Sequence, residues 1–119
     1  MLRNSHMIEN YDFGKILIDG KKYNSDIIIF KDHVYDSWWR KEGHNLCIDD
    51  IKEIINKKPD VLIIGTGYFG LMKVSKELID SIKFSGIKQV IIKKTGDACT
   101  EYNKLYEKNN LVAAFHLTC

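Results

Sequence analysis

Three apolar runs in the second half of the chain constrain its fold more than any other feature. They are DVLIIG (60–65), KQVIIK (88–93) and LVAAFHL (111–117), each of strand length. The intervening segments, 75–86 and 97–110, carry apolar residues at helical spacing. Near-continuous apolar strands alternating with amphipathic helices are typical of parallel strands covered by helices. We therefore expect a βαβαβ unit in this half.

The ends of the expected helices carry the usual capping residues. Ser75 is expected to cap a helix that ends at Gly86, and Asp97 a helix that ends near Asn109. A further short helix is expected over residues 49–59, because Asp49 is a suitable N-cap and Pro59 stops helical pairing.

The first half indicates β structure instead. The run KILIDGKKY (15–23) places Asp19-Gly20 between two strand-like segments, a strong hairpin signal. DIIIF (26–30) and HVYDSWW (33–39) are further strand candidates. The expected fold class is thus α/β: a single layered domain with a β-rich N-terminal half and a hairpin, followed by a βαβαβ unit with parallel strands.

Length and charge exclude several classes of protein. A chain of 119 residues is expected to form one domain. The net charge is +2, from 18 basic and 16 acidic residues, which is too balanced to favour nucleic acid or an anionic membrane as partner. No apolar run is long enough for a membrane span, and the N-terminus lacks the apolar core of a signal peptide. We interpret residues 1–6 as added in cloning and 7–119 as the domain.

The cysteines favour a reducing compartment. Cys47, Cys99 and Cys119 are an odd number without a CxxC pair, which favours free thiols and a cytoplasmic location. His44 and His116 each precede a cysteine by three positions, but a strand at 111–117 would separate His116 from Cys119, so no metal site is predicted. Cys99 lies in the first turn of a predicted helix and would be reactive only if exposed.

A glycine motif follows the first apolar run. Gly65, Gly67 and Gly70 have the G-x-G-x-x-G spacing of a dinucleotide-binding turn. The next strand, however, ends in Lys93-Lys94 rather than in the acidic residue that would hold a ribose. The alternative interpretation is a tight turn whose glycines permit positive φ and close packing. No cofactor is predicted, and the fold is not expected to be a true Rossmann fold.

The segment WWRKEGHNLC (38–47) is chemically denser. Neighbouring residues of an extended segment point to opposite sides, so Trp38 and Trp39 cannot both enter the same core. One indole beside Arg40 and His44 would form a binding surface for an anion, a flat ring or a protein. In the equally weighted alternative, one indole packs in the core and the other covers a sheet edge.

Several motifs together resemble the Mth-nine-thirty-eight-like domain family. They are FGKILIDGKKYNSDIIIF, WWRKEGHNLC, PDVLIIGTGYFG, Tyr102-Asn103 and the terminal HLTC, and the resemblance spans residues 7–119. It implies a layered α/β fold distinct from the Rossmann fold, with members that include an assembly factor acting through protein contacts. It implies no established catalytic residue or cofactor. The positions shared with the family would be Trp39, Arg40, His44, Gly65, Gly67 and His116.

Two functions remain open from the sequence. The favoured one is a non-enzymatic protein-interaction or assembly module with an unidentified protein partner and a contact surface at 38–44. The alternative is a small-molecule or anion-binding protein, or an unassigned enzyme, with a pocket at the Gly65–Gly67 turn. The candidate binding residues for the two are Trp38, Trp39, Arg40, His44, Gly65, Gly67 and His116.

Overall fold

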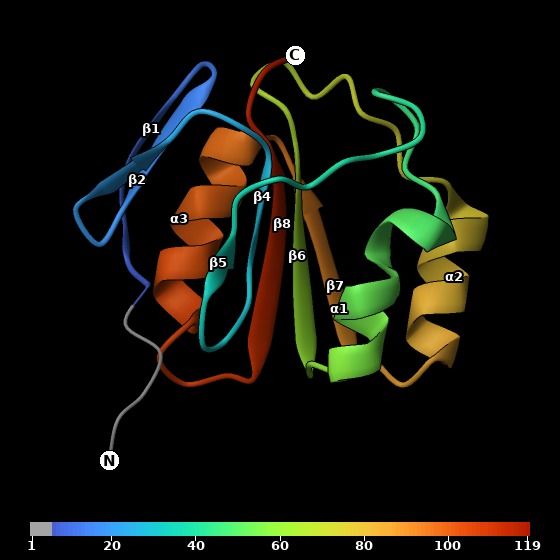
Figure 1. Ribbon diagram of the computed structural model, residues 1–119. Helices are drawn as coiled ribbons and strands as arrows, with labels where there is room; N and C mark the ends of the chain where they lie inside the picture. Colours follow the sequence, from blue (N-terminus) through green and yellow to red (C-terminus); the bar gives the residue numbers. More distant parts are fainter. Residues whose placement is uncertain (1–5) are drawn as a thin grey trace.

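The computed structural model describes residues 6–119. They form three layers, with a five-stranded sheet as the middle layer (Figure 1). The sheet has the order β5-β4-β8-β6-β7, and a separate three-stranded sheet has the order β1-β2-β3. The elements are β1 (Ile8–Asp12), β2 (Lys15–Ile18), β3 (Lys21–Tyr23), β4 (Ile27–Ile29), β5 (Val34–Tyr35), the 3-10 helix η1 (Ile48–Ile51), α1 (Lys52–Lys57), β6 (Val61–Thr66), α2 (Lys76–Phe84), β7 (Gln89–Lys93), α3 (Thr95–Leu105) and β8 (Leu111–His116).

The five-stranded sheet is mixed. Strands β7, β6 and β8 are parallel neighbours, whereas β4 pairs antiparallel with β8 and with β5. The expected βαβαβ unit, β6-α2-β7-α3-β8, is confirmed, as is the β-rich first half. The Asp19-Gly20 hairpin is also confirmed: both residues have positive φ, 50° and 80°, as a two-residue turn between twisted strands requires.

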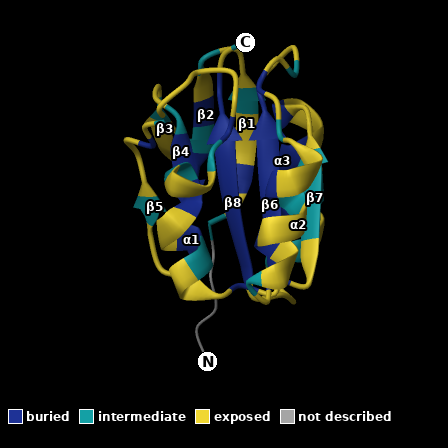
Figure 2. Cartoon of the chain, turned by 90° about the vertical axis from the view of Figure 1, so that its right-hand side faces the viewer, coloured by how far each residue is buried: buried dark blue, intermediate teal, exposed yellow. Residues whose placement is uncertain are grey.

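Side-chain alternation along the central strands divides the core into two. Val61 and Ile63 of β6 face α3 and the three-stranded sheet, whereas Leu62 and Ile64 face η1, α1 and α2. All residues of β6 and β8 are buried, because both faces of these strands are covered (Figure 2). The carboxyl ends of β6 and β8 point to the end of the molecule where the C-terminus and several loops lie (Figure 1).

Three local predictions differ from the structure. Helix α3 begins at Thr95 rather than at Asp97, because the buried Thr95 hydroxyl bonds two neighbouring strand ends and starts the helix there. Only Val34–Tyr35 of the expected strand 33–39 pairs as a strand. Residues Ile8–Asp12 form β1, which the sequence pattern did not indicate. Except for His6, the segment interpreted as added in cloning, 1–6, lies outside the described residues. No helix within 6–119 is long and apolar enough to cross a membrane.

Candidate functional site

The two tryptophans lie on opposite sides of an extended segment that follows β5. Trp38 is buried, with 6% of its surface exposed, whereas Trp39 is 73% exposed. The backbone N–H of Trp38 donates to the carbonyl of Asp26 at 3.0 Å, and its Nε1–H donates to the carbonyl of Asp50 at 2.9 Å. The segment is thereby fixed to β4 on one side and to η1 on the other. Alternation along this fixed backbone then directs Trp39 to the surface.

Arg40 continues the alternation and points inward. Its Nη1 donates to Oδ2 of Asp26 at 2.8 Å, its Nη2 donates to the carbonyl of Gly43 at 3.3 Å, and its guanidinium lies 4.7 Å from the centre of the Trp38 ring. The side chains of Arg40 and Asp26 are only 5% and 17% exposed. The sequence led us to expect Arg40 on the surface beside the exposed indole. The structure shows instead that Arg40 is buried and anchors the segment.

His116 completes this buried charged cluster at the end of β8. Its Nδ1 lies 2.8 Å from Oδ2 of Asp26 and 3.0 Å from Nη2 of Arg40. Because a carboxylate only accepts hydrogen bonds, Nδ1 must carry a proton to donate to Asp26. With that proton Nδ1 cannot also accept from the guanidinium, so the 3.0 Å approach of Arg40 Nη2 is a contact and not a second hydrogen bond. The backbone N–H of Leu117 donates to the other carboxylate oxygen of Asp26 at 2.7 Å. Asp26 therefore joins β4, β8 and the Trp38–Arg40 segment.

The ionisation of Asp26 follows from these contacts. Burial alone would raise the pKa of this carboxyl, but the hydrogen bonds from His116, Leu117 and Arg40 outweigh burial and hold its pKa below the usual value. Asp26 is therefore a carboxylate at neutral pH and balances the charge of Arg40. A buried pair of this kind is strongly destabilised when one partner is removed.

Two nitrogen atoms of the cluster lack partners among residues 6–119. They are Nε of Arg40 and Nε2 of His116, and both are inaccessible to solvent. The exposed His44 lies beside His116, with its ring centre 6.0 Å from that of His116. The structure therefore places His44 next to His116, which contacts Arg40.

The glycine turn is closed over by other parts of the chain. Gly65 and Gly67 are buried, and a Cβ at Gly65 would lie 2.7 Å from the Phe115 ring. Gly67 has φ +109°, and a Cβ there would collide with the backbone carbonyl of Cys119. The chain end lies against this turn (Figure 1), where Thr118 accepts a 2.7 Å hydrogen bond from Tyr68 N–H. The glycines thus serve close packing, and their backbone is not an open wall of a surface pocket.

The position at which α2 begins also argues against a dinucleotide-binding turn. Helix α2 begins at Lys76, after the Ser75 hydroxyl, which accepts from Leu78 N–H at 3.1 Å. Residues 67–75 are a loop, so α2 does not begin within the glycine motif. The start of α3 lies against the turn instead, where Gly67 N–H donates to the Thr95 hydroxyl at 2.8 Å and closes it. A dinucleotide-binding turn would require α2 to begin within the glycine motif.

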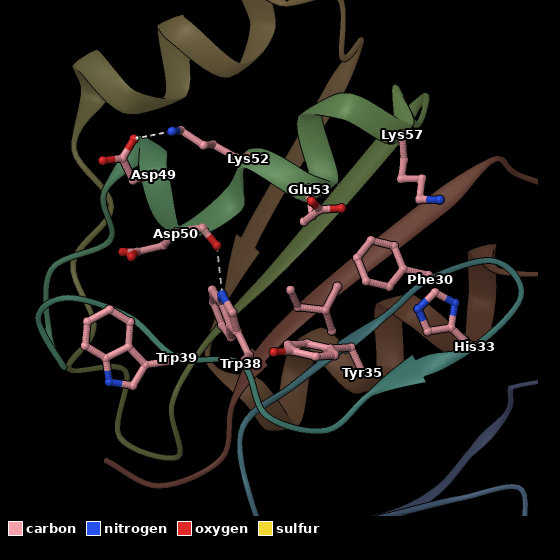
Figure 3. A pocket seen from close by; sticks show the side chains of 11 residues that line it. Phe30, His33, Tyr35, Trp38, Trp39, Asp49, Asp50, Lys52, Glu53 and Lys57 are labelled. Atoms are coloured by element: carbon pink, nitrogen blue, oxygen red, sulfur yellow. Dashed lines mark hydrogen bonds and ion pairs between the residues drawn. The ribbon is translucent and has the colours of Figure 1, made fainter.

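A groove lies next to Trp39, and two of the predicted residues, Trp38 and Trp39, line it. Its volume is about 480 Å³, within the range of small-ligand sites. It runs between β4–β5 and the η1–α1 segment, with Trp39 at one end and Phe30 and His33 at the other (Figure 3). It is lined by Ile28, Phe30, His33, Tyr35, Trp38, Trp39, Asp49, Asp50, Lys52, Glu53 and Lys57.

The three cysteines are free thiols. Cys99 is 6% exposed, and burial raises the pKa of its thiol to about 12, so it is protonated at neutral pH. Cys47 and Cys119 are partly exposed. Within the described part of the chain, no three His, Cys, Asp or Glu side chains gather as a metal site.

Sequence reasoning missed Asp26, Tyr35 and Glu53. Asp26 is ninety positions from His116, so no local pattern connects them. The register of β4 with β8 would have done so: Ile27 pairs with Phe115, which places Asp26 opposite His116. Tyr35 and Glu53 line the same groove only because η1 and α1 pack beside β4 and β5.

Fold and site together define a class: a three-layer α/β domain with a mixed sheet, a closed glycine turn and an aromatic groove beside a buried Asp-Arg-His cluster. Residues 8–117 match the family model described as "Protein of unknown function (DUF498/DUF598)". The chain therefore belongs to the DUF498/DUF598 family.

Solved structures agree with this assignment. A conserved hypothetical protein from Pyrococcus horikoshii OT3 is 28% identical, with 94% of this chain and 98% of that chain covered and a TM-score of 0.78. The protein MT938 is 26% identical over 97% and 100%, with a TM-score of 0.79. A Mth938-like domain from Bordetella pertussis, 18% identical over 96% and 87%, shares the fold with a TM-score of 0.65. The resemblance to Mth938-like domains is thus confirmed.

Proposed function

We propose that this domain is a non-enzymatic binding module that recognises a partner protein through the groove beside Trp39. The observation that carries the proposal is the 73% exposed indole of Trp39, held at the groove by two buried neighbours in sequence. Exposing so large an aromatic ring costs solvation free energy that a bound partner would recover. Tryptophan is also among the residues most enriched at binding hot spots.

The fixed backbone around Trp39 also supports a role in partner binding. Trp38 and Arg40 fix the backbone on both sides of Trp39 through hydrogen bonds to Asp26 and Asp50. An anchor that is already ordered loses little conformational entropy when a partner binds. The free thiols of the chain fit our proposal of a cytoplasmic location.

The experiment compares what immobilised wild type and variants retain from an extract of the native organism. We expect Trp39→Ala to lose a protein that wild type retains. Phe84→Ala is the matched control, because Phe84 is 95% exposed on α2, away from the groove. The interaction is then measured with that protein in purified form. If Trp39→Ala and wild type retain the same proteins in the same amounts, the proposal is wrong.

A second candidate function is binding of a small anion by the Arg40–His116 cluster. The unpartnered Nε–H of the Arg40 guanidinium and the exposed imidazole of His44 next to His116 favour it. Loss of the His44 imidazole would then weaken the site without removing a buried group. A thermal-shift screen with phosphates and carboxylates tests it: stabilisation of wild type that is reduced in His44→Ala supports this function, and no stabilisation rejects it.

A further inference from the structure

The groove offers flat aromatic surfaces to a ligand. Tyr35 and Trp39 line it with 47% and 73% of their surfaces exposed, and the buried Trp38 lies between them. In Figure 3 the rings of Trp38 and Tyr35 stand side by side, with Trp39 at the end of the groove. Aromatic faces carry negative electrostatic potential and attract cations, tryptophan most strongly. The aromatic lining thus favours a cationic or apolar group over an anion.

The carboxylates along the opposite wall differ in how they are used. Asp49 pairs with Lys41 at 3.1 Å and with Lys52 at 3.5 Å. The Asp50 carboxylate accepts from the backbone N–H groups of Cys47 and Lys41 at 2.9 and 3.2 Å. Glu53 is exposed and has no hydrogen bond or ion pair within residues 6–119. Glu53 is therefore the carboxylate of the groove that is available to a ligand.

Neither lysine of the groove forms an ion pair with Glu53 within residues 6–119, although Lys57 lies four positions after it on α1. Lys52 is directed to Asp49, as the dashed line in Figure 3 marks. Lys57 lies at the end with Phe30 and His33, where its charge lowers the pKa of Asp32 together with the larger effect of His33. In the part of the groove between Trp39 and Glu53, Lys52 is thus paired with Asp49, and Glu53 is the carboxylate without an ion pair within residues 6–119.

We propose that this part of the groove binds an arginine side chain from a basic segment of the partner protein. The inference rests on the function proposed above and names the chemistry of the partner. A guanidinium is planar, stacks on aromatic rings and donates two parallel hydrogen bonds to a carboxylate. Trp39 and Tyr35 provide the rings, and Glu53 provides the carboxylate. An ammonium group lacks the planar face and the paired donors, so arginine fits better than lysine.

The probe is the tripeptide acetyl-Gly-Arg-Gly-amide, compared with the same peptide carrying citrulline, a neutral analogue of arginine of nearly equal shape. Binding is followed by the ¹⁵N–¹H signals of the two indole groups. We expect the arginine peptide to shift the Trp39 indole signal and to leave the Trp38 signal, whose N–H is bonded to Asp50, nearly unchanged. Added salt should weaken this binding because both ligand charge and Glu53 are near the surface.

Two glutamates allow a matched substitution. Glu53 lies in the first turn of α1 and Glu77 in the first turn of α2, and both are exposed. Glu53→Gln should weaken the arginine peptide about two- to fivefold, as expected for one exposed ion pair. Glu77→Gln should leave its affinity unchanged, and Trp39→Ala should reduce the peptide-induced shift of the Tyr35 ring signals.

The outcomes separate this inference from the proposed function. Equal binding of the citrulline and arginine peptides, or equal effects of Glu53→Gln and Glu77→Gln, would overturn the arginine site. No signal change with the arginine peptide would also overturn it. If Trp39→Ala nevertheless loses the partner from extracts, the binding function stands and only the chemistry of the partner is wrong. If the arginine peptide binds but no protein depends on Trp39, the proposed function fails instead.

Discussion

The glycine turn at 65–67 and the tryptophan segment at 38–40 both look like sites in the sequence, and the chain treats them oppositely. The turn is covered by Phe115 and by the backbone of Thr118 and Cys119. The tryptophan segment buries its first and third residues and leaves the second in solvent. Glycines remove side chains, so neighbouring backbone can fill the space, whereas alternation in an anchored extended segment must expose every second residue. Surface exposure therefore follows from how each segment is anchored.

The largest effect is expected from removing the charge that anchors the tryptophan segment. Asp26→Asn keeps the size of the side chain but leaves Arg40 buried without its counter-ion. We expect a loss of about 3–5 kcal/mol in the free energy of unfolding, measured by urea denaturation. Asp36→Asn, an exposed aspartate ten residues later, is the control and should change stability by less than about 0.5 kcal/mol. Similar losses in both variants would contradict the anchoring role.

The pH dependence of stability tests whether the charge of Asp26 anchors the tryptophan segment. Folding lowers the pKa of Asp26, so the unfolded chain binds this proton first as pH falls. The stabilisation is complete above the unfolded pKa of about 4 and is lost as pH drops through the lower pKa of the folded state. The stability difference between wild type and Asp26→Asn should therefore narrow below about pH 4. A difference that stays constant down to pH 2 would mean that the charge of Asp26 is not responsible.

The next effect is expected at the glycine turn. Gly67→Ala adds a methyl group against the backbone of Cys119 at a positive φ, and we expect a loss of roughly 2–4 kcal/mol. Gly86→Ala isolates the cost of positive φ, because Gly86 has φ +111° and open space around it. It should cost about 1 kcal/mol. Equal losses in thermal or urea unfolding would show that the covered turn adds nothing beyond backbone strain.

A smaller effect is expected where the loop after the turn ends. Ser75→Ala removes the hydroxyl that caps α2 and should cost about 1 kcal/mol. If the helix instead continued from the glycine motif, Ser75 would be an interior position, where alanine is the better residue. A neutral or stabilising Ser75→Ala in urea denaturation would therefore contradict the closed-turn arrangement.

The smallest effect on stability is expected for Trp39, the exposed residue of the tryptophan segment. Trp39→Ala should change the free energy of unfolding by less than about 0.5 kcal/mol, because most of the indole is already in solvent. Trp38→Ala, by contrast, would leave a cavity and cost about 3–5 kcal/mol. A loss above about 1 kcal/mol for Trp39→Ala would show that its ring belongs to the fold and not to a binding surface.

The fold was largely predictable because its strongest signals are local. The buried strands at 61–66, 89–93 and 111–116 read as continuous apolar runs, and the Asp19-Gly20 hairpin has its own turn residues. β1 was missed because its sequence, IENYD, exposes most of its polar residues and buries mainly Ile8. The start of α3 was misplaced because Thr95 is held by Gly67 and His116, which no local pattern records.

The candidate site was less predictable for the same reason. The opposite orientation of Trp38 and Trp39 follows from alternation alone, and the sequence named both as candidate binding residues. The sequence could not show that Arg40 points inward, because its partners Asp26 and His116 are fourteen and seventy-six positions away. Nor could it show the groove, which exists only once η1 and α1 pack beside β4 and β5.

The strand order has a consequence for how the chain folds. β8, the last strand in chain order, lies in the middle of the five-stranded sheet, between β4 and β6. During synthesis, the hairpin β4–β5 and the parallel pair β6–β7 have no shared neighbour until residues 111–116 emerge. The hydrogen bonds of Asp26 with His116 and Leu117 also cannot form before these residues are synthesised. Such long-range closure predicts slow folding and leaves the nascent chain dependent on its final segment, so removal of β8 would prevent the whole sheet from forming.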